Sequence, residues 1–316
     1  MFTEIPAADW RALIGSALTF SAIAPWEWVG ESQVFGVQLP DFEEKVYCAV
    51  LGQAGMMKAI ALYPGQLGWK SYLALGAQST ETDSNEVIVR QRCLFTSFVS
   101  QEKADADDLA LLKHIGQTLE KGQPVPMIRS YRPGFVPQPP DRTEILLMRQ
   151  VFAKALELLT YLPGAPFALP TDGFNEEGKV LFSVETADGA GPEFQWLAPD
   201  STLDFSPTVV TLSIEQRALG RSLPLVEGIW LMENFYLTKA AETEDGTQFY
   251  PQVFCFLDLE AQGFRGVSLL EPDGFPDLVG AVLTEMLRQQ GCRPSQIVVS
   301  KKQNLMLTLK VATGYF

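Results

Sequence analysis

The sequence is poor in the residues that most often carry catalysis or bind metals. Its 316 residues include one histidine, His114, and four cysteines that lie far apart in the chain. A zinc site needs cysteines or histidines at short spacings such as Cys-x-x-Cys, and a nucleophile activated by histidine would have to use His114. No Gly-x-Ser-x-Gly motif is present to supply such a nucleophile. We therefore expect no metal or other cofactor, and we expect the protein not to be an enzyme.

Clusters of basic residues are also missing. The chain has 24 Lys and Arg against 38 Asp and Glu, a net charge of −14, and both halves are acidic. A surface that binds nucleic acid needs clustered Lys and Arg, because affinity comes from neutralising phosphates and releasing their counterions. The one basic doublet, Lys301-Lys302, is typical of a solvated turn. The sequence therefore argues against nucleic acid as a partner.

Long apolar runs are absent as well. No stretch approaches the ~18 apolar residues that a membrane-spanning helix requires, and Met1–Pro6 has neither a basic nor an apolar leader region. At 47% hydrophobic residues, the chain is nevertheless apolar enough to form a folded core. We expect a cytoplasmic protein with reduced cysteines that does not enter a membrane, and the length favours two domains.

Residues 1–165 are predicted to form an α+β domain. Apolar residues recur at helical spacing in several segments, and Asp141 with Glu144 forms a capping-box pattern at the start of the last helix. The loop Gly52–Gly55 has the length and the glycines of a β-hairpin. The expected helices are 6–21, 66–75, 105–119 and 141–161, and the expected strands are 33–37, 45–51, 57–63 and 87–100. The run 163–166, Pro-Gly-Ala-Pro, ends the last helix and is the expected domain boundary.

Residues 166–316 are predicted to form a second domain, in which a mixed sheet is combined with helices. A hairpin is expected at 180–185 and 194–197. A strand near 209–212 and a short helix near 214–219 come next. The last elements are expected in the order strand, acidic loop, two strands, helix and strand, at 229–237, 239–247, 251–259, 264–270, 276–290 and 296–300. Residues 302–312 permit two interpretations, because their apolar residues alternate as in a strand while Gly314 suits the end of a helix.

Two segments of the first part are candidate binding sites. Arg129, Tyr131 and Arg132 lie in a loop fixed by proline, and two arginines can clamp a carboxylate or phosphate through paired hydrogen bonds. The alternative is that these arginines pair with the protein's own carboxylates. Trp26 and Trp28 can line a pocket or an interface, since aromatic side chains bury large areas. Here the alternative is packing in the core beneath the first helix.

The second part contains two acidic residues that are placed like metal ligands. Glu233 and Asp258 lie on the first and second strands of the expected sheet. Two-metal nucleases hold ions ~3.5–4 Å apart with acids from different strands. Ser300 closes the last strand, where a third acid would be needed. Two acids without a third argue against catalysis, so any metal site would rest on Glu233 and Asp258 alone.

Four short motifs connect the first half with a known group of proteins. They are Pro-Trp-Glu-Trp at 25–28, Gly-x-x-Gly at 52–55, Tyr-x-Gly-x-x-Gly at 63–68 and Arg-Ser-Tyr-Arg-Pro-Gly at 129–134. With these motifs the chain resembles an uncharacterised bacterial family. Residues 175–316 are similar to a second domain of unknown function that often follows the first. The resemblance implies a two-domain architecture and no particular activity.

Residues 229–300 also resemble the integrase and transposase branch of the ribonuclease H-like fold in the order of their elements. The missing acids imply a degenerate version of that fold, and fold analogy does not establish function. The leading interpretation is a non-catalytic interaction or ligand-binding module, whose partner is an unknown protein or a small anionic ligand. One alternative is a metal-dependent nucleic-acid-processing enzyme of ribonuclease H-like fold. Another is a small-molecule hydrolase, which no motif in the sequence supports.

Overall fold

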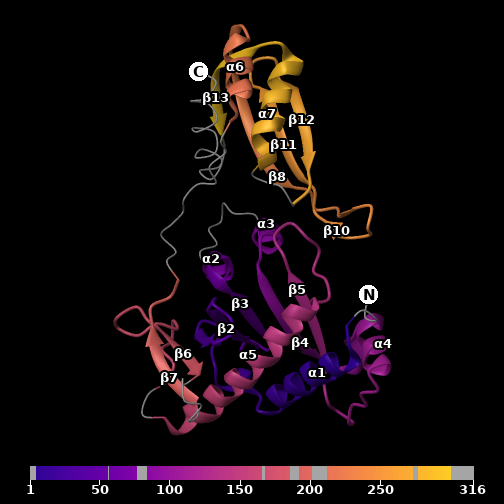
Figure 1. Ribbon diagram of the computed structural model, residues 1–316, viewed down its shortest axis with the longest axis vertical. Helices are drawn as coiled ribbons and strands as arrows, with labels where there is room; N and C mark the ends of the chain where they lie inside the picture. The colour runs from indigo at the N-terminus through magenta and orange to yellow at the C-terminus, as the bar shows by residue number, and fades with distance from the viewer. Residues whose placement is uncertain are drawn as a thin grey trace. The chain divides into compact units, whose positions relative to one another are not determined.

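A computed structural model describes residues 5–55, 57–76, 84–165, 168–185, 192–200, 212–272 and 277–299. The chain forms two compact units with helices and mixed sheets, an α+β protein as expected (Figure 1). The first unit comprises Met1–Glu81, Gln91–Arg132 and Pro137–Thr202, and the second comprises Thr82–Arg90, Pro133–Val136 and Leu203–Phe316. In the described residues, no helix combines the length and the apolar character that crossing a membrane requires.

The first unit is built around a seven-stranded sheet with the strand order β5-β4-β3-β2-β1-β6-β7. Neighbouring strands are antiparallel except β1 and β6, which are parallel. The strands are β1 Phe35–Gln38, β2 Val46–Leu51, β3 Ala59–Pro64, β4 Cys93–Val99, β5 Val125–Tyr131, β6 Val180–Glu185 and β7 Pro192–Leu197. The predicted hairpin around Gly52–Gly55 is the β2–β3 pair.

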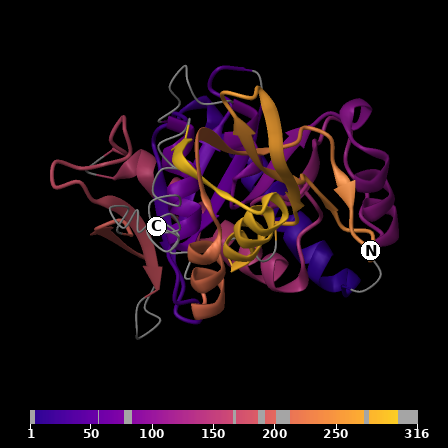
Figure 2. The same cartoon turned by 90° about the horizontal axis from the view of Figure 1, so that it is seen from above.

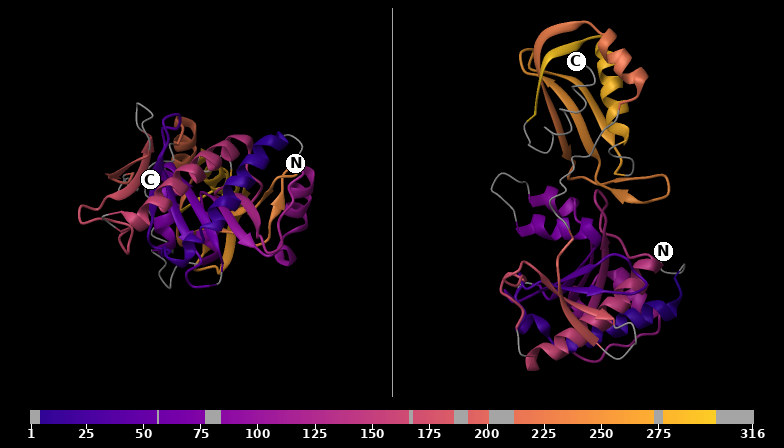
Figure 3. Two further views of the ribbon diagram at one scale, coloured as in Figure 1. Left: turned by 90° about the horizontal axis from the view of Figure 1, so that it is seen from below. Right: turned by 60° about the vertical axis from the view of Figure 1, so that its left-hand side comes forward.

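Helices cover both faces of this sheet. The long helices α1 (Ala7–Ala22) and α5 (Arg142–Tyr161) pack against one face, where their apolar stripes join the main core (Figure 3, left). Helix α2 (Gly65–Gly76) covers the other face, and its Trp69 stacks on Tyr47 with ring centroids 4.3 Å apart. The shorter helix α4 (Ala106–His114) follows a 3-10 turn, η3 (Gln101–Lys103), and ends at the exposed His114.

The predicted capping box starts α5. The Asp141 carboxylate accepts a hydrogen bond from the Glu144 backbone N–H at 2.8 Å, and the Glu144 carboxylate accepts one from the Asp141 N–H at 3.1 Å. The other Glu144 oxygen accepts from Arg92 at 2.9 Å and from the Ser130 hydroxyl at 2.8 Å. The cap therefore also ties α5 to strand β5 and to Arg92, the residue that precedes β4.

We expect Asp141→Ala to lower the free energy of unfolding by about 1 kcal/mol, because the substitution leaves a helix N–H without its side-chain acceptor. Urea denaturation of the full chain measures this loss. Asp41→Ala is the control, since Asp41 is exposed and caps no helix. An equal effect of the two substitutions would contradict the role of the cap.

The hairpin β6–β7 corrects the expected domain boundary. The 3-10 turn η4 (Leu162–Gly164) ends α5 as predicted, but the chain then returns to the same sheet, where β6 pairs with β1. Figure 1 and Figure 2 show β6 and β7 at one margin of that sheet. Leu181 and Phe182 are fully buried on opposite faces of β6. The first unit thus continues well beyond residue 165, because these side chains complete its core.

The expected strand 87–100 is also different in the structure. Its first part is a helix, α3 (Ser84–Val89), and only Cys93–Val99 forms a strand, β4. Glu86 and Arg90 form a salt bridge at 2.8 Å with helical i,i+4 spacing, and the apolar Ile88 is exposed. The β-branched residues Val87–Val89 favour a strand by composition, but the ion pair and the contacts of this segment in the second unit select a helix.

The second unit is built around a four-stranded sheet with the order β12-β11-β8-β13, in which β13 is parallel to β8 and the other pairs are antiparallel. The element order follows the prediction. The bounds are α6 Ile214–Ser222, β8 Leu225–Tyr236, β9 Ala241–Glu242, β10 Gln248–Phe249, β11 Gln252–Asp258, β12 Gly263–Leu270, α7 Asp277–Gln290 and β13 Arg293–Val299. The segment expected to be an acidic loop contains the short strand β9, which pairs with β10 directly after that segment. Residues 209–211, Ser300 and residues 302–312 lie outside the described residues.

Helix α7 packs on one face of this sheet. Leu283, Met286 and Leu287 of α7 contact the buried Trp230 and Phe256 of the strands. Figure 3 (right) shows α6 and α7 on the same side of the sheet. The apolar core of the second unit therefore lies between these helices and one face of the sheet.

Candidate functional site

The two tryptophans of the Pro-Trp-Glu-Trp motif have different environments. The 3-10 turn η2 (Pro25–Glu27) follows α1 and turns Trp26 into the main core, where its ring centroid lies 5.4 Å from that of Phe98. The Lys58 ammonium lies 5.5 Å from the Trp26 ring centroid, a cation–π geometry. Trp28, one residue after the turn, is 41% exposed. Trp26 therefore belongs to the core, and Trp28 is available at the surface.

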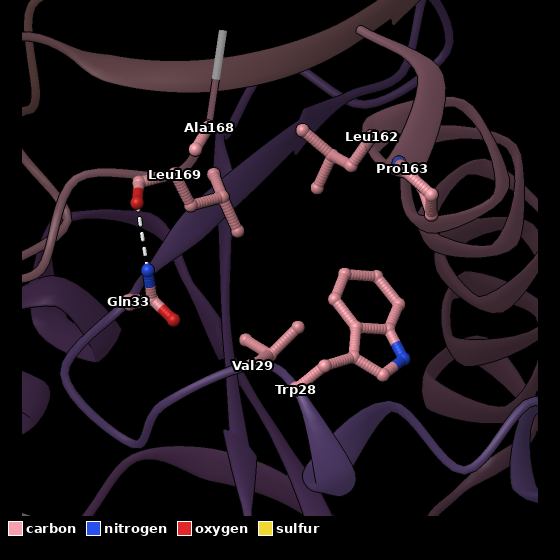
Figure 4. A pocket seen from close by; sticks show the side chains of 7 residues that line it. All are labelled: Trp28, Val29, Gln33, Leu162, Pro163, Ala168 and Leu169. Carbon is pink, nitrogen blue, oxygen red and sulfur yellow. Dashed lines mark hydrogen bonds between the residues drawn. The ribbon is translucent and has the colours of Figure 1, made fainter.

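Trp28 forms one wall of a pocket of about 410 Å³ in the first unit (Figure 4). One side of the pocket comes from the chain after η2, and the other comes from η4 and the chain that follows it. The seven lining residues are Trp28, Val29, Gln33, Leu162, Pro163, Ala168 and Leu169. The sequence identified Trp28 but not the opposite wall, because no local pattern reveals that residues more than a hundred positions later return to this place.

Gln33 fastens the two sides of the pocket to each other. Its side-chain N–H donates to the backbone oxygen of Leu169 at 2.7 Å, and its side-chain oxygen accepts from the backbone N–H of Gly30 at 2.7 Å. Apart from the indole N–H of Trp28, this amide is the only polar side-chain group of the lining. The pocket can therefore bind an apolar group by burial, and its lining offers no acid, base or nucleophile.

Arg129 lies on strand β5 and not in the predicted loop, and it is held by the protein's own carboxylates. Its two terminal nitrogens donate to the two carboxylate oxygens of Asp108 at 2.8 and 2.6 Å, and one of them also donates to Asp105 at 2.9 Å. Asp108, in the first turn of α4, is only 4% exposed. The hydrogen bonds to Asp108 raise the pKa of Arg129 above its ordinary value. The geometry is the bidentate clamp expected of this motif, and the clamped group is internal.

The other members of the arginine motif also make contacts within the protein. The Tyr131 ring packs edge-on against Phe95 with a centroid distance of 5.9 Å, and Arg132 donates to the Gln138 side-chain oxygen at 3.3 Å. None of Arg129, Tyr131 and Arg132 lines the Trp28 pocket. The structure therefore does not bring the two predicted binding segments together in one pocket.

Gly134 gives the end of the motif a structural role in the second unit. Its N–H donates to the Val89 oxygen at 2.7 Å, and its own oxygen accepts from the Tyr250 N–H at 2.7 Å. Its φ of +84° is in the left-handed region, and a Cβ here would lie 2.6 Å from Pro272. Only glycine fits both conditions. The Pro-Gly pair thus anchors a piece of the first half of the chain within the second unit.

The two candidate metal ligands point away from each other. In the β8–β11 ladder, Glu233 lies opposite Cys255 and Asp258 lies opposite Trp230. Successive residues of a strand alternate between its faces, so an offset of three residues places the two carboxylates on opposite faces of the sheet. In the described part of the chain, no three His, Cys, Asp or Glu side chains are grouped as metal ligands. Glu233 and Asp258 are not arranged to share an ion.

Asp258 stabilises the turn between β11 and β12. One carboxylate oxygen accepts from the backbone N–H groups of Glu260 and Ala261, at 2.9 and 2.8 Å, and the other accepts from the Arg265 guanidinium at 2.6 Å. These bonds, led by that from Ala261, lower the pKa of Asp258. Because the pKa of Asp258 is lower in the folded than in the unfolded state, the ionised carboxylate stabilises the fold at neutral pH. This stabilisation is lost as the pH falls through the folded-state pKa of Asp258.

The buried cysteines of the first unit are not arranged as nucleophiles. Cys48 and Cys93 lie within the sheet and form no disulfide. Burial raises the pKa of Cys93 to about 12 and that of Cys48 further. Thiolates are the reactive form of cysteine, so both side chains remain inert thiols at neutral pH.

Comparisons with known proteins find two successive domains in the chain. A family model described as Domain of unknown function (DUF7309) matches residues 10–173, and one described as Domain of unknown function (DUF6930) matches residues 217–313. No curated protein and no solved structure gives a significant match. The two adjacent domains of unknown function confirm the resemblance inferred from the sequence motifs.

Proposed function

The chain belongs to the DUF7309 family, whose description assigns no activity, and we propose from the geometry at Trp28 that the protein is a non-catalytic binding module. In this proposal, the Trp28 pocket takes up an apolar side chain of a protein partner. The observation that carries the proposal is a half-exposed tryptophan in a pocket whose walls are otherwise almost wholly apolar. Exposed aromatic side chains beside a pocket are the anchors that dominate many protein interfaces.

The size of the pocket supports a side chain as the occupant. Its volume of about 410 Å³ is at the lower end of the range for small-molecule sites. A space of this size accommodates one large aromatic or aliphatic side chain together with part of its backbone. Since the Gln33 amide is already hydrogen-bonded at both ends, the occupant gains its affinity mainly from apolar burial against Trp28 and the walls of the pocket.

The charge around the pocket supports a basic partner sequence. Glu27 and Glu31 flank Trp28 in the chain, and both are exposed. With a net charge of −14, the whole chain attracts cations and repels anions at long range. We therefore propose that the apolar anchor of the partner is accompanied by Lys or Arg, and we replace the anionic ligand of the sequence-based hypothesis by this basic segment.

Capped amino acids test the pocket directly. In the ¹⁵N-labelled full chain, N-acetyl amides of tryptophan, phenylalanine and leucine serve as probes for the anchor side chain. We expect the indole N–H signal of Trp28, identified by its loss in Trp28→Phe, to shift with millimolar affinity, as suits so small a ligand. Trp28→Ala should abolish saturable binding of all three probes. It should also lower the free energy of unfolding by about 2 kcal/mol, because more than half of the side chain is buried, and circular dichroism checks that the variant stays folded.

Leu67→Ala is the matched control for this experiment. Leu67 is exposed on α2 and does not line the pocket, so this variant should bind the probes as the parent does. If the probes leave the Trp28 signal unmoved, or if the Trp28→Ala variant binds them equally well, the pocket is not the binding site.

A further inference from the structure

The sheet of the second unit has a second face, opposite α7, that is rich in exposed apolar side chains. On the edge strand β12, Phe264 is 68% exposed, Val267 54% and Leu269 62%. The strand register aligns Leu269 with Val253 and Phe235, and Phe264 with Leu257 and Leu231. Val298 of β13 continues the second row beyond Leu231. We call this surface the open face; its residues are Phe264, Val267, Leu269, Val253, Cys255, Leu257, Leu231, Glu233, Phe235 and Val298, of which Val253 and Cys255 are themselves buried.

The open face is large enough to form an interface. Its exposed apolar side chains present on the order of 500 Å² per copy of the chain, as much as the largest apolar patch of a typical monomer. Two such faces in contact would bury about 1,000 Å², the lower limit for a specific protein–protein interface. Strand β12 is moreover an edge strand, and its one charged residue, Arg265, is held by Asp258 and is not part of the open face.

We propose that two copies of the chain associate through their open faces, sheet against sheet. Homodimer interfaces are more apolar than other interfaces and poor in charge, and the residues of the open face include a single charged side chain, that of Glu233. Two identical twisted sheets can also pack face to face in the aligned geometry of a β-sandwich, related by a two-fold axis. The chain carries −14 charges, so self-association needs a surface that is nearly free of charge, as this face is.

Glu233 gives the proposal a second, opposite test. The strand register aligns Glu233 of β8 with Cys255 of β11 and Val267 of β12, and the Glu233 side chain is half-buried. Among the described residues it forms no salt bridge or side-chain hydrogen bond. Covering an unpaired carboxylate costs free energy, so the dimer should tighten when the charge is removed. The charge of Glu233 would then limit the strength of the dimer, which would explain why an acidic residue lies on this apolar surface.

Sedimentation velocity of the full chain over a range of micromolar concentrations tests the proposal. We expect a reversible dimer for the parent and, for Phe264→Asp or Leu269→Asp, a dimer dissociation constant raised about a hundredfold or more, because each dimer would bury two uncompensated charges. Glu233→Gln should lower the dissociation constant. Leu67→Asp is the control, because Leu67 is 66% exposed on α2 of the first unit, and it should leave the dimer unchanged.

Circular dichroism and thermal unfolding of each variant show whether the fold is retained, as expected for substitutions at exposed positions. Two independent charge substitutions guard against the failure of one to fold. A parent chain that stays monomeric would overturn the proposal, whether β12 is then free or is covered by another part of the chain. A dimer that survives both Phe264→Asp and Leu269→Asp would also overturn it, since association would then use another surface.

Discussion

Replacing Arg129 with methionine should lower the free energy of unfolding of the first unit by about 3 kcal/mol, at the lower end of the range for breaking a buried ion pair. Asp108 is almost completely buried and would keep a charge without a partner, whereas the apolar stem of the methionine retains much of the packing of Arg129. Arg129 itself is partly exposed, which moderates the loss. Urea denaturation of the full chain measures the change.

A double-mutant cycle separates the ion pair from packing. In Arg129→Met/Asp108→Leu the carboxylate is gone as well, so most of the stability should return, because an apolar pair of similar volume can replace a buried ion pair at little cost. Asp105→Ala is the matched control, since its carboxylate contacts the same guanidinium from an exposed position and should contribute at most about 1 kcal/mol. A stable Arg129→Met that has lost the binding of an added anion would instead make Arg129 a ligand group.

At both candidate sites, the sequence predicted the type of chemistry but not which side chains are free to bind a partner. The motif around Arg129 carried the right chemistry, a bidentate clamp, but the identity of the clamped group depends on Asp108, which reaches Arg129 only through the packing of α4 on β5. For the tryptophans, the spacing of the motif gave two aromatic residues and no means to tell core from surface. That distinction arises from η2, a single 3-10 turn that directs Trp26 inward and leaves Trp28 outside.

Elements determined by local patterns were predicted well. The helices α1 and α5, the capping box at Asp141 and the β2–β3 hairpin were all predicted. Each is determined by apolar periodicity or turn residues within one short segment of the sequence. Non-local pairing was not accessible in the same way. The parallel contact of β6 with β1 joins residues almost 150 positions apart, and a strand pair of this kind leaves no signature in either segment. The loop run at 163–166 was therefore taken for a boundary although it only ends a helix.

Gly36 tests that non-local contact. It pairs with Phe182 across the β1–β6 ladder, and a Cβ at Gly36 would lie 2.1 to 2.4 Å from carbons of the fully buried Phe182 ring. The ring has no free space to move into, because it packs in the aromatic cluster with Tyr47. We expect Gly36→Ala to lower the free energy of unfolding by about 3 kcal/mol, at the upper end of the usual cost of overpacking, as measured by urea denaturation.

Gly15→Ala is the matched control, because nothing lies within 4 Å of the added methyl group in α1, and alanine should stabilise the helix by up to about 1 kcal/mol. Phe182→Ala should also reverse the effect of Gly36→Ala: in its background the added methyl group enters the space left by the ring, so the two losses should combine to much less than their sum. If Gly36→Ala is as stable as the parent and shows no coupling to Phe182, then β6 does not pack against β1. The first unit would in that case end near residue 165, as the sequence alone suggested.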